Sequence, residues 1–84
     1  MFKLQVSAKA RKELKQISRI YEKTAIIEAI DDIKEDPLLG KPLNREFFGM
    51  FSYKVGVYRI VYKITEQDKK IIVLRIRHRS TVYR

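Results

Sequence analysis

The chain has no cysteine and a single histidine, His78, among its 84 residues. A disulfide scaffold and a cysteine-ligated zinc site are excluded, because both need several sulfur atoms. No stretch approaches the roughly 20 apolar residues that a membrane-spanning helix requires. The first residues contain no apolar segment of signal-peptide length. We therefore expect a cytoplasmic protein with no membrane partner, no metal and no cofactor.

The short length restricts the architecture. A chain of 84 residues fits one domain, and we expect residues 1–84 to form it. Large two-domain enzymes with a cofactor cleft are excluded. Hydrophobic residues at 45% and charged residues at 35% indicate a folded globule and not a disordered basic tail.

Acidic residues are scarce outside one segment of the chain. The formal net charge is +9, divided into +5 for residues 1–20, −4 for residues 21–40 and +8 for residues 41–84. Such an excess favours a polyanion or an acidic protein as partner. A basic surface that is merely solvated is the alternative interpretation.

The N-terminal half is typical of one strand followed by two helices. Residues 2–6 alternate apolar and polar side chains, which predicts a strand with one buried face. Ser7 is placed to cap a helix, and a helix must end before Asp36-Pro37. A single helix between them would be long for this domain, so we expect two antiparallel helices with a break near Ile17–Arg19. The expected apolar faces are Ala10, Leu14, Ile17 and Tyr21, and then Ile26, Ile27, Ile30 and Ile33.

The remaining residues predict strands. A loop is expected over Pro37–Pro42, and alternation then marks strands near 51–55, 58–64 and 71–77, with a hairpin loop over Thr65–Lys70. The resulting fold class is α+β, with element order β-α-α-β-β-β. It has a small, mostly antiparallel sheet with two helices packed on one face.

Alternation along the strands also predicts what each face of the sheet carries. The helix-facing side chains are expected to be Tyr58, Ile60, Tyr62, Ile72, Leu74 and Ile76. The opposite face would carry Lys54, Arg59, Lys63, Arg75, Arg77 and Arg79 over a floor of Val57, Val61 and Val73. Because Arg binds phosphate oxygens in a bidentate manner, this cationic face favours a phosphate or carboxylate site, with a solvated face as the alternative.

The segment 77–83 holds the densest cluster of chemically useful side chains. RNA cleavage without metal needs activation of a 2′-OH, stabilisation of charge on the phosphate and a proton for the leaving 5′ oxygen. Arginine suits the second task, and Tyr83 or His78 suits the third. The alternatives are that Tyr83 merely packs and that His78 points toward the helices as a core or edge residue.

Two blocks of sequence resemble the RelE/ParE superfamily of bacterial and archaeal toxins. Residues 53–62, YKVGVYRIVY, are similar to that family's stretch YR-x-R-x-G-x-YR-x-x-Y, and residues 76–83, IRHRSTVY, are similar to its ending HR-x-x-VY. Residues 7–14 and the helix exit at 36–37 fit as well, so the resemblance covers essentially the whole chain.

The resemblance implies a toxin of a type II toxin–antitoxin system, with a cognate antitoxin as partner. The RelE branch cleaves mRNA on the ribosome without metal, by attack of the 2′-OH, whereas the ParE branch inhibits DNA gyrase and is not a nuclease. On the RelE pattern, Arg59 would grip the phosphate, Arg77 or else Arg79 would be the tail arginine, and Tyr83 would act as acid or base. The further candidates for binding RNA phosphate are Lys54, Arg75, Arg79 and His78, and His78 is also an alternative acid or base.

The chain departs from the RelE pattern at the start of the second strand of that pattern. RelE toxins usually have two lysines at alternate positions at the start of this strand. This chain has Met50 and Ser52 there, and Lys54 replaces the missing lysines only in part. We expect a RelE-like endoribonuclease that acts on ribosome-bound mRNA. The alternatives are a ParE-like inhibitor of DNA gyrase and a degenerate toxin that only binds its antitoxin.

Overall fold

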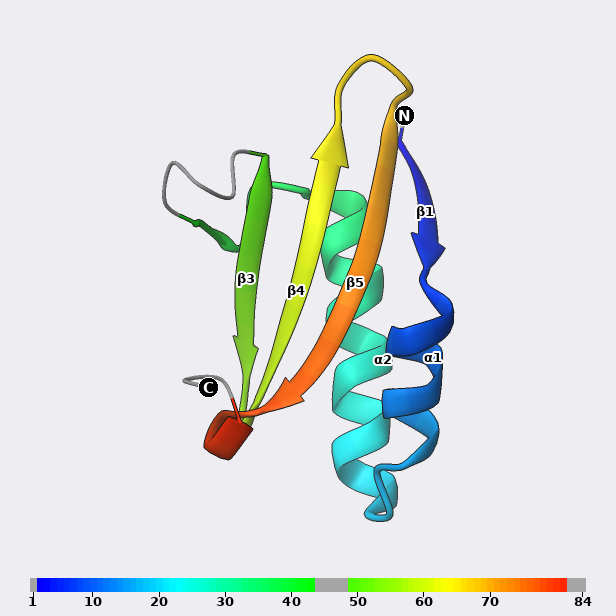
Figure 1. The fold of residues 1–84 in the computed structure, drawn as a ribbon, viewed down its shortest axis with the longest axis vertical. Helices are drawn as coiled ribbons and strands as arrows, with labels where there is room; N and C mark the ends of the chain where they lie inside the picture. Colours follow the sequence, from blue (N-terminus) through cyan, green and yellow to red (C-terminus); the bar gives the residue numbers. More distant parts are fainter. Residues whose placement is uncertain (1, 44–48, 82–84) are drawn as a thin grey trace.

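In a computed structural model, which describes residues 2–43 and 49–81, two helices lie on one face of a five-stranded mixed sheet (Figure 1). The strand order is β1-β5-β4-β3-β2, in which β1 pairs with β5 in parallel and the other neighbours are antiparallel. This confirms the α+β fold. The elements are β1 (Lys3–Val6), α1 (Ala8–Lys15), α2 (Ile20–Glu35), β2 (Lys41–Pro42), β3 (Met50–Val55), β4 (Tyr58–Thr65), β5 (Lys70–His78) and the 3-10 helix η2 (Arg79–Thr81).

The two-residue strand β2 was not expected from the sequence, which predicts a loop over Pro37–Pro42. Lys41 pairs with Ser52 and Pro42 pairs with Phe51 at the outer edge of β3. Proline is tolerated there because an edge strand leaves one side of its backbone without a ladder partner. The short strand adds a fifth member to the sheet.

Local sequence determines where the helices begin and end. Ser7 Oγ accepts a hydrogen bond from the Ala10 N–H at 3.0 Å and so caps α1. α1 ends at Lys15, Ile17 is buried in the connection, and α2 ends immediately before Asp36. The predicted break between the helices is therefore confirmed.

Two residues expected on the buried helix faces are exposed instead. Tyr21 is 67% exposed and Ile27 is 46% exposed. Tyr21 lies in the first turn of α2, after the break, so it does not continue the face of α1. Ile27 is one residue, or about 100°, around the helix from the buried Ile26. The residues that α2 buries are Ile26, Ala29, Ile30 and Ile33.

A β-bulge changes the pairing between β4 and β5. Val61 pairs with Arg75, but the next residue, Tyr62, pairs with Val73. Leu74 is therefore an extra residue on β5 without an opposite partner. An extra residue reverses which face the following side chains occupy.

The bulge explains an error in the predicted faces of β5. Ile71, Val73 and Ile76 are fully or almost fully buried against the helices. Ile72 and Leu74, predicted to face the helices, are only partly buried. Val73, predicted for the floor of the cationic face, belongs to the core. Strict alternation fails here because β5 contains one residue more than β4 between the two neighbouring pairs.

Tyr62 ties the chain after α2 to the sheet. Its side chain is completely buried, and its hydroxyl donates to the Pro37 carbonyl at 2.7 Å and accepts from the Gly40 N–H at 2.9 Å. Burial raises the pKa of the Tyr62 phenol, so the hydroxyl stays protonated and able to donate. A Cβ at position 40 would lie 2.7 Å from that hydroxyl oxygen. Segment 37–40 is thus held closely against the sheet.

Candidate functional site

Three basic side chains form one row across the sheet. Lys54 on β3 pairs with Arg59 on β4, and Arg59 pairs with Arg77 on β5. Directly opposite residues share a face, and the neighbouring Ile60 is buried on the helix side, so these three face away from the helices. We call Lys54, Arg59 and Arg77 the basic row. None of the described strand residues is acidic, so the sheet itself supplies no carboxylate to this row.

A hollow of about 390 Å³ lies beside the basic row and adds a fourth cation. Gly56, with φ +60°, makes the tight turn between β3 and β4. The backbone N–H of Arg79 donates to the Val57 carbonyl in that turn at 2.7 Å, which brings Arg79 next to the row. We call this the first hollow. Its lining residues are Lys54, Gly56, Tyr58, Arg59, Arg79 and Ser80.

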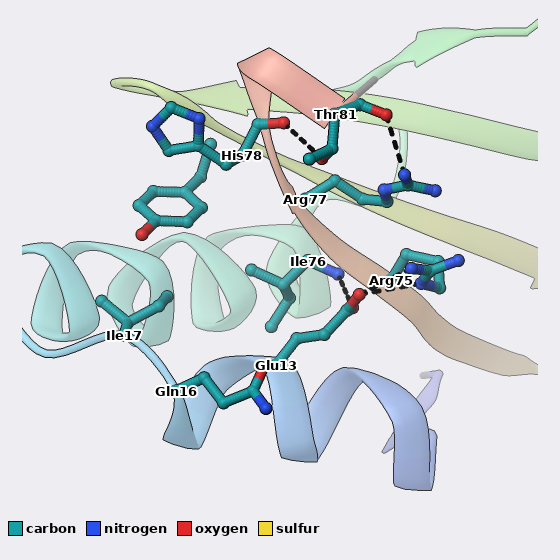
Figure 2. A pocket seen from close by; sticks show the side chains of 9 residues that line it. Glu13, Gln16, Ile17, Arg75, Ile76, Arg77, His78 and Thr81 are labelled. Atoms are coloured by element: carbon teal, nitrogen blue, oxygen red, sulfur yellow. Dashed lines mark hydrogen bonds and ion pairs between the residues drawn. The ribbon is translucent and has the colours of Figure 1, made fainter. Parts of the chain in front are cut away.

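Arg77 also orients the chain that follows β5 (Figure 2). Its Nη2 donates to the Thr81 carbonyl at 2.8 Å, and Thr81 Oγ1 donates to the His78 carbonyl at 2.8 Å. These bonds fold η2 back toward the end of the sheet. Tyr83, the predicted acid or base, lies outside the described residues.

His78 lies on the opposite face from the basic row. It pairs with Tyr58 at the end of β5, and the two rings meet edge to face with centroids 5.3 Å apart. The Ser80 N–H donates to His78 Nδ1 at 3.1 Å. The ring is exposed at the edge of the sheet, as alternation with Arg77 predicted. Among the described residues, no three His, Asp or Glu side chains are grouped to hold a metal ion.

Comparison with known proteins identifies the family. A family model described as the ParE toxin of type II toxin–antitoxin systems, parDE, matches residues 4–83. The chain belongs to this toxin family. Toxin RelG of Mycobacterium tuberculosis is 42% identical to this toxin over 62 residues, which cover 71% of each chain. Toxin RelE of the same organism is 39% identical over 46 residues, or 55% of this chain and 47% of the relative.

Solved structures agree with the fold of this toxin. A chain of the toxin–antitoxin complex RelBE2 of Mycobacterium tuberculosis superimposes with a TM-score of 0.82 at 32% identity, covering 93% of this chain and 98% of that one. The isolated RelE toxin of E. coli gives a TM-score of 0.80 at 20% identity, covering 99% and 92%, a likeness in fold alone. The resemblance to the RelE/ParE superfamily is therefore confirmed, and this protein is a toxin of a type II toxin–antitoxin system.

In this toxin, Arg75 is engaged away from the basic row (Figure 2). Its Nη2 and Nε donate to Glu13 Oε2 at 2.7 and 3.0 Å, and the Ile76 N–H donates to Glu13 Oε1 at 2.7 Å. The strand β1 ends at Val6, so the edge of β5 beyond it has no neighbouring strand. The Glu13 carboxylate provides an acceptor for the Ile76 N–H at that edge and holds the Arg75 guanidinium beside it.

The partner of Arg75 was missed by sequence reasoning. The net charge of +8 over residues 41–84 gave no sign of a carboxylate partner for Arg75, because Glu13 comes from α1, 62 positions away. Partial burial favours a higher pKa for Glu13, yet the bonds from Arg75 and the Ile76 N–H outweigh burial and hold that pKa below its usual range. Two of the three guanidinium nitrogens of Arg75 are therefore engaged by Glu13.

Proposed function

We propose that this toxin is an endoribonuclease that cleaves mRNA on the ribosome and needs no metal. The observation that carries the proposal is the basic row, in which Lys54, Arg59 and Arg77 share one face without an acidic strand residue. Guanidinium groups are suited to phosphate oxygens, and they stabilise the charge that develops on phosphorus. Likeness to toxins RelG and RelE supports the same activity.

The proposed reaction is an internal transfer within the RNA. The 2′-OH loses its proton to solvent and attacks the adjacent phosphorus, the bond from phosphorus to the 5′ oxygen breaks, and a 2′,3′-cyclic phosphate forms. Arg59 and Arg77 bind the equatorial oxygens, and Lys54 and Arg79 bind neighbouring phosphates. Tyr83 gives the proton to the leaving 5′ oxygen. His78, the alternative proton donor expected from the sequence, faces away from the basic row and is not used in this reaction.

A cognate antitoxin is the second proposed partner. The RelBE2 structure is of a toxin–antitoxin complex, and this chain is 32% identical to a chain of it. An acidic to amphipathic segment of the antitoxin would be attracted to the basic row and would cover it. A ribosome as target places the free toxin in the cytoplasm. No helix of the described chain is long and apolar enough to cross a membrane.

Induced expression of Arg59→Ala and Arg77→Ala tests the site. We expect the parent toxin to arrest growth and to produce mRNA 5′ ends within ribosomal A-site codons, and both variants to lose these ends while they stay folded. Lys63→Ala is the matched control, since Lys63 is an exposed cation of β4 outside the basic row. Full toxicity of both arginine variants would show that the proposed site is wrong.

The family match makes inhibition of DNA gyrase the second candidate function, because the matching model is described as a ParE toxin. Loss of gyrase-dependent supercoiling with intact translation would favour that activity. Binding to an antitoxin without any toxicity would identify a degenerate member, in line with Met50 and Ser52 at the usual lysine positions.

A further inference from the structure

A second hollow, of about 580 Å³, lies between residues 39–43 and β3. It shares Lys54 and Arg59 with the first hollow, so the same two cations separate the two spaces. Lys41 adds a third positive charge at the second hollow. The volume is in the range of about 300–1,000 Å³ that is typical of small-ligand pockets.

The wall of the second hollow is both apolar and held in place. Leu39, Pro42 and Leu43 supply its aliphatic surface, and Tyr53 lines it from β3. The Leu43 N–H donates to the Met50 carbonyl at 2.9 Å, and the Leu39 N–H donates to the Asp36 carbonyl at 3.1 Å. The Gly40 N–H is bound by the buried Tyr62 hydroxyl. A wall fixed in this way loses little conformational entropy when a ligand binds.

We propose that the second hollow receives the nucleotide next to the scissile phosphate. This inference rests on the proposed function, in which Arg59 binds that phosphate. The base would lie against Leu39, Pro42 and Leu43, because protein pockets hold an unstacked base between apolar or aromatic side chains. Lys41 would bind the phosphate of this nucleotide. One RNA strand would thus occupy both hollows by passing over Lys54 and Arg59.

An NMR titration of the isotope-labelled toxin tests this base-binding role. The probes are a single-stranded RNA trinucleotide and the same trinucleotide without its terminal base. We expect the complete trinucleotide to shift the amide signals of Gly40, Lys41 and Leu43, and the abasic one to leave them nearly unchanged. Leu39→Ala removes aliphatic surface that the base would cover, and should weaken binding of the complete trinucleotide about five- to tenfold.

Leu38→Ala is the matched control, because Leu38 is the adjacent leucine, is 71% exposed and does not line the second hollow. Equal shifts from both probes, or equal losses in the two leucine variants, would overturn the inference. A Leu39→Ala toxin that still binds the trinucleotide but no longer binds its antitoxin would also overturn the inference, since the surface would then recognise protein.

The titration does not depend on cleavage, so its result is separate from that of the proposed function. A toxin that cuts ribosomal mRNA without amide shifts at Gly40, Lys41 and Leu43 would contradict the inference alone. A toxin that shows these shifts but cuts no mRNA would contradict the endonuclease and keep the base site.

Discussion

Arg59 and Arg77 lie directly opposite each other on the antiparallel strands β4 and β5. Like charges in this position repel each other, at a cost of about 0.2–1 kcal/mol. Lys54, opposite Arg59 on its other side, places a third positive charge in the same row. Folding alone would favour a neutral or oppositely charged partner. A phosphate bound between these side chains, as the proposed function requires, would lower this repulsion.

Arg59→Gln should separate stability from toxicity. Glutamine keeps a long polar side chain that can hydrogen-bond and removes one charge from the basic row, so we expect the free energy of unfolding to change by less than about 1 kcal/mol. Growth arrest should be lost in the same variant. Urea unfolding followed by circular dichroism measures the first quantity, and induced expression measures the second.

Lys63→Gln is the control for Arg59→Gln. Lys63 lies on the same strand, but its partners Met50 and Ile72 carry no charge. We expect neither stability nor toxicity to change. If Arg59→Gln unfolded at a clearly lower urea concentration than the parent toxin, repulsion within the basic row would not be the dominant effect of Arg59 on stability.

Glu13→Gln should weaken the edge of β5 at neutral pH. The Glu13 carboxylate accepts bonds from both Arg75 and the Ile76 N–H, and its side chain is 19% exposed. Hydrogen bonds to charged groups contribute about 1.5–3 kcal/mol, and partial exposure reduces this to about 1–2 kcal/mol. Chemical denaturation at neutral pH measures the difference from the parent toxin.

The lowered pKa of Glu13 predicts that the stability of the toxin depends on pH. The pKa of Glu13 is lower in the folded state than in the unfolded chain, where it is about 4.3. The contribution of Glu13 to the free energy of unfolding is therefore complete above the pKa of the unfolded chain and disappears as pH falls through the pKa of the folded state. The stability difference between parent and Glu13→Gln should therefore shrink as pH falls from neutral to about 3. Glu28→Gln, at an exposed residue of α2, is the control for the loss of a surface carboxylate.

Local signals in the sequence were enough for most of the fold. Ser7 and Asp36-Pro37 determine where helices can begin and end, and both act over a few residues. The bulge opposite Val61 and Tyr62 was not predictable, because it depends on how two strands pair and leaves no local signal. The tie from Tyr62 to Gly40 was missed for the same reason, since 22 residues separate them.

The candidate site, too, could be predicted from the sequence only in part. Alternation predicted that Lys54, Arg59 and Arg77 share a face, and the register of three strands places them in one row. Contacts from other elements were not visible in the sequence, so the partnership of Arg75 with Glu13 was missed. Charge counting compares residues along the chain, whereas an ion pair depends on where α1 packs.

Ser7 connects the start of α1 to the bulge in β5. Its Oγ accepts from the Ala10 N–H and donates to the Leu74 carbonyl, both at 3.0 Å. Ser7→Ala loses both bonds and should lower the free energy of unfolding by about 1–2 kcal/mol. Ser7→Asp restores a cap acceptor but has no proton to donate at neutral pH. Thermal unfolding should place Ser7→Asp between Ser7→Ala and the parent, and equal losses in both variants would show that the cap contributes nothing.

Tyr62→Phe should release segment 37–40 from the sheet. The change keeps the buried ring but removes the hydroxyl, which leaves the Gly40 N–H and the Pro37 carbonyl without their partner. An unsatisfied buried group costs about 1–3 kcal/mol, so we expect a loss of that size in urea unfolding. Gly40→Ala should destabilise the same contact by steric conflict with the hydroxyl. The double variant removes the nearest contact of the added Cβ, while those with the Ser52 carbonyl oxygen and Tyr62 Cε1, both at 3.0 Å, remain. The combined loss should therefore be less than the sum of the two, and an additive loss would contradict a direct contact between positions 40 and 62.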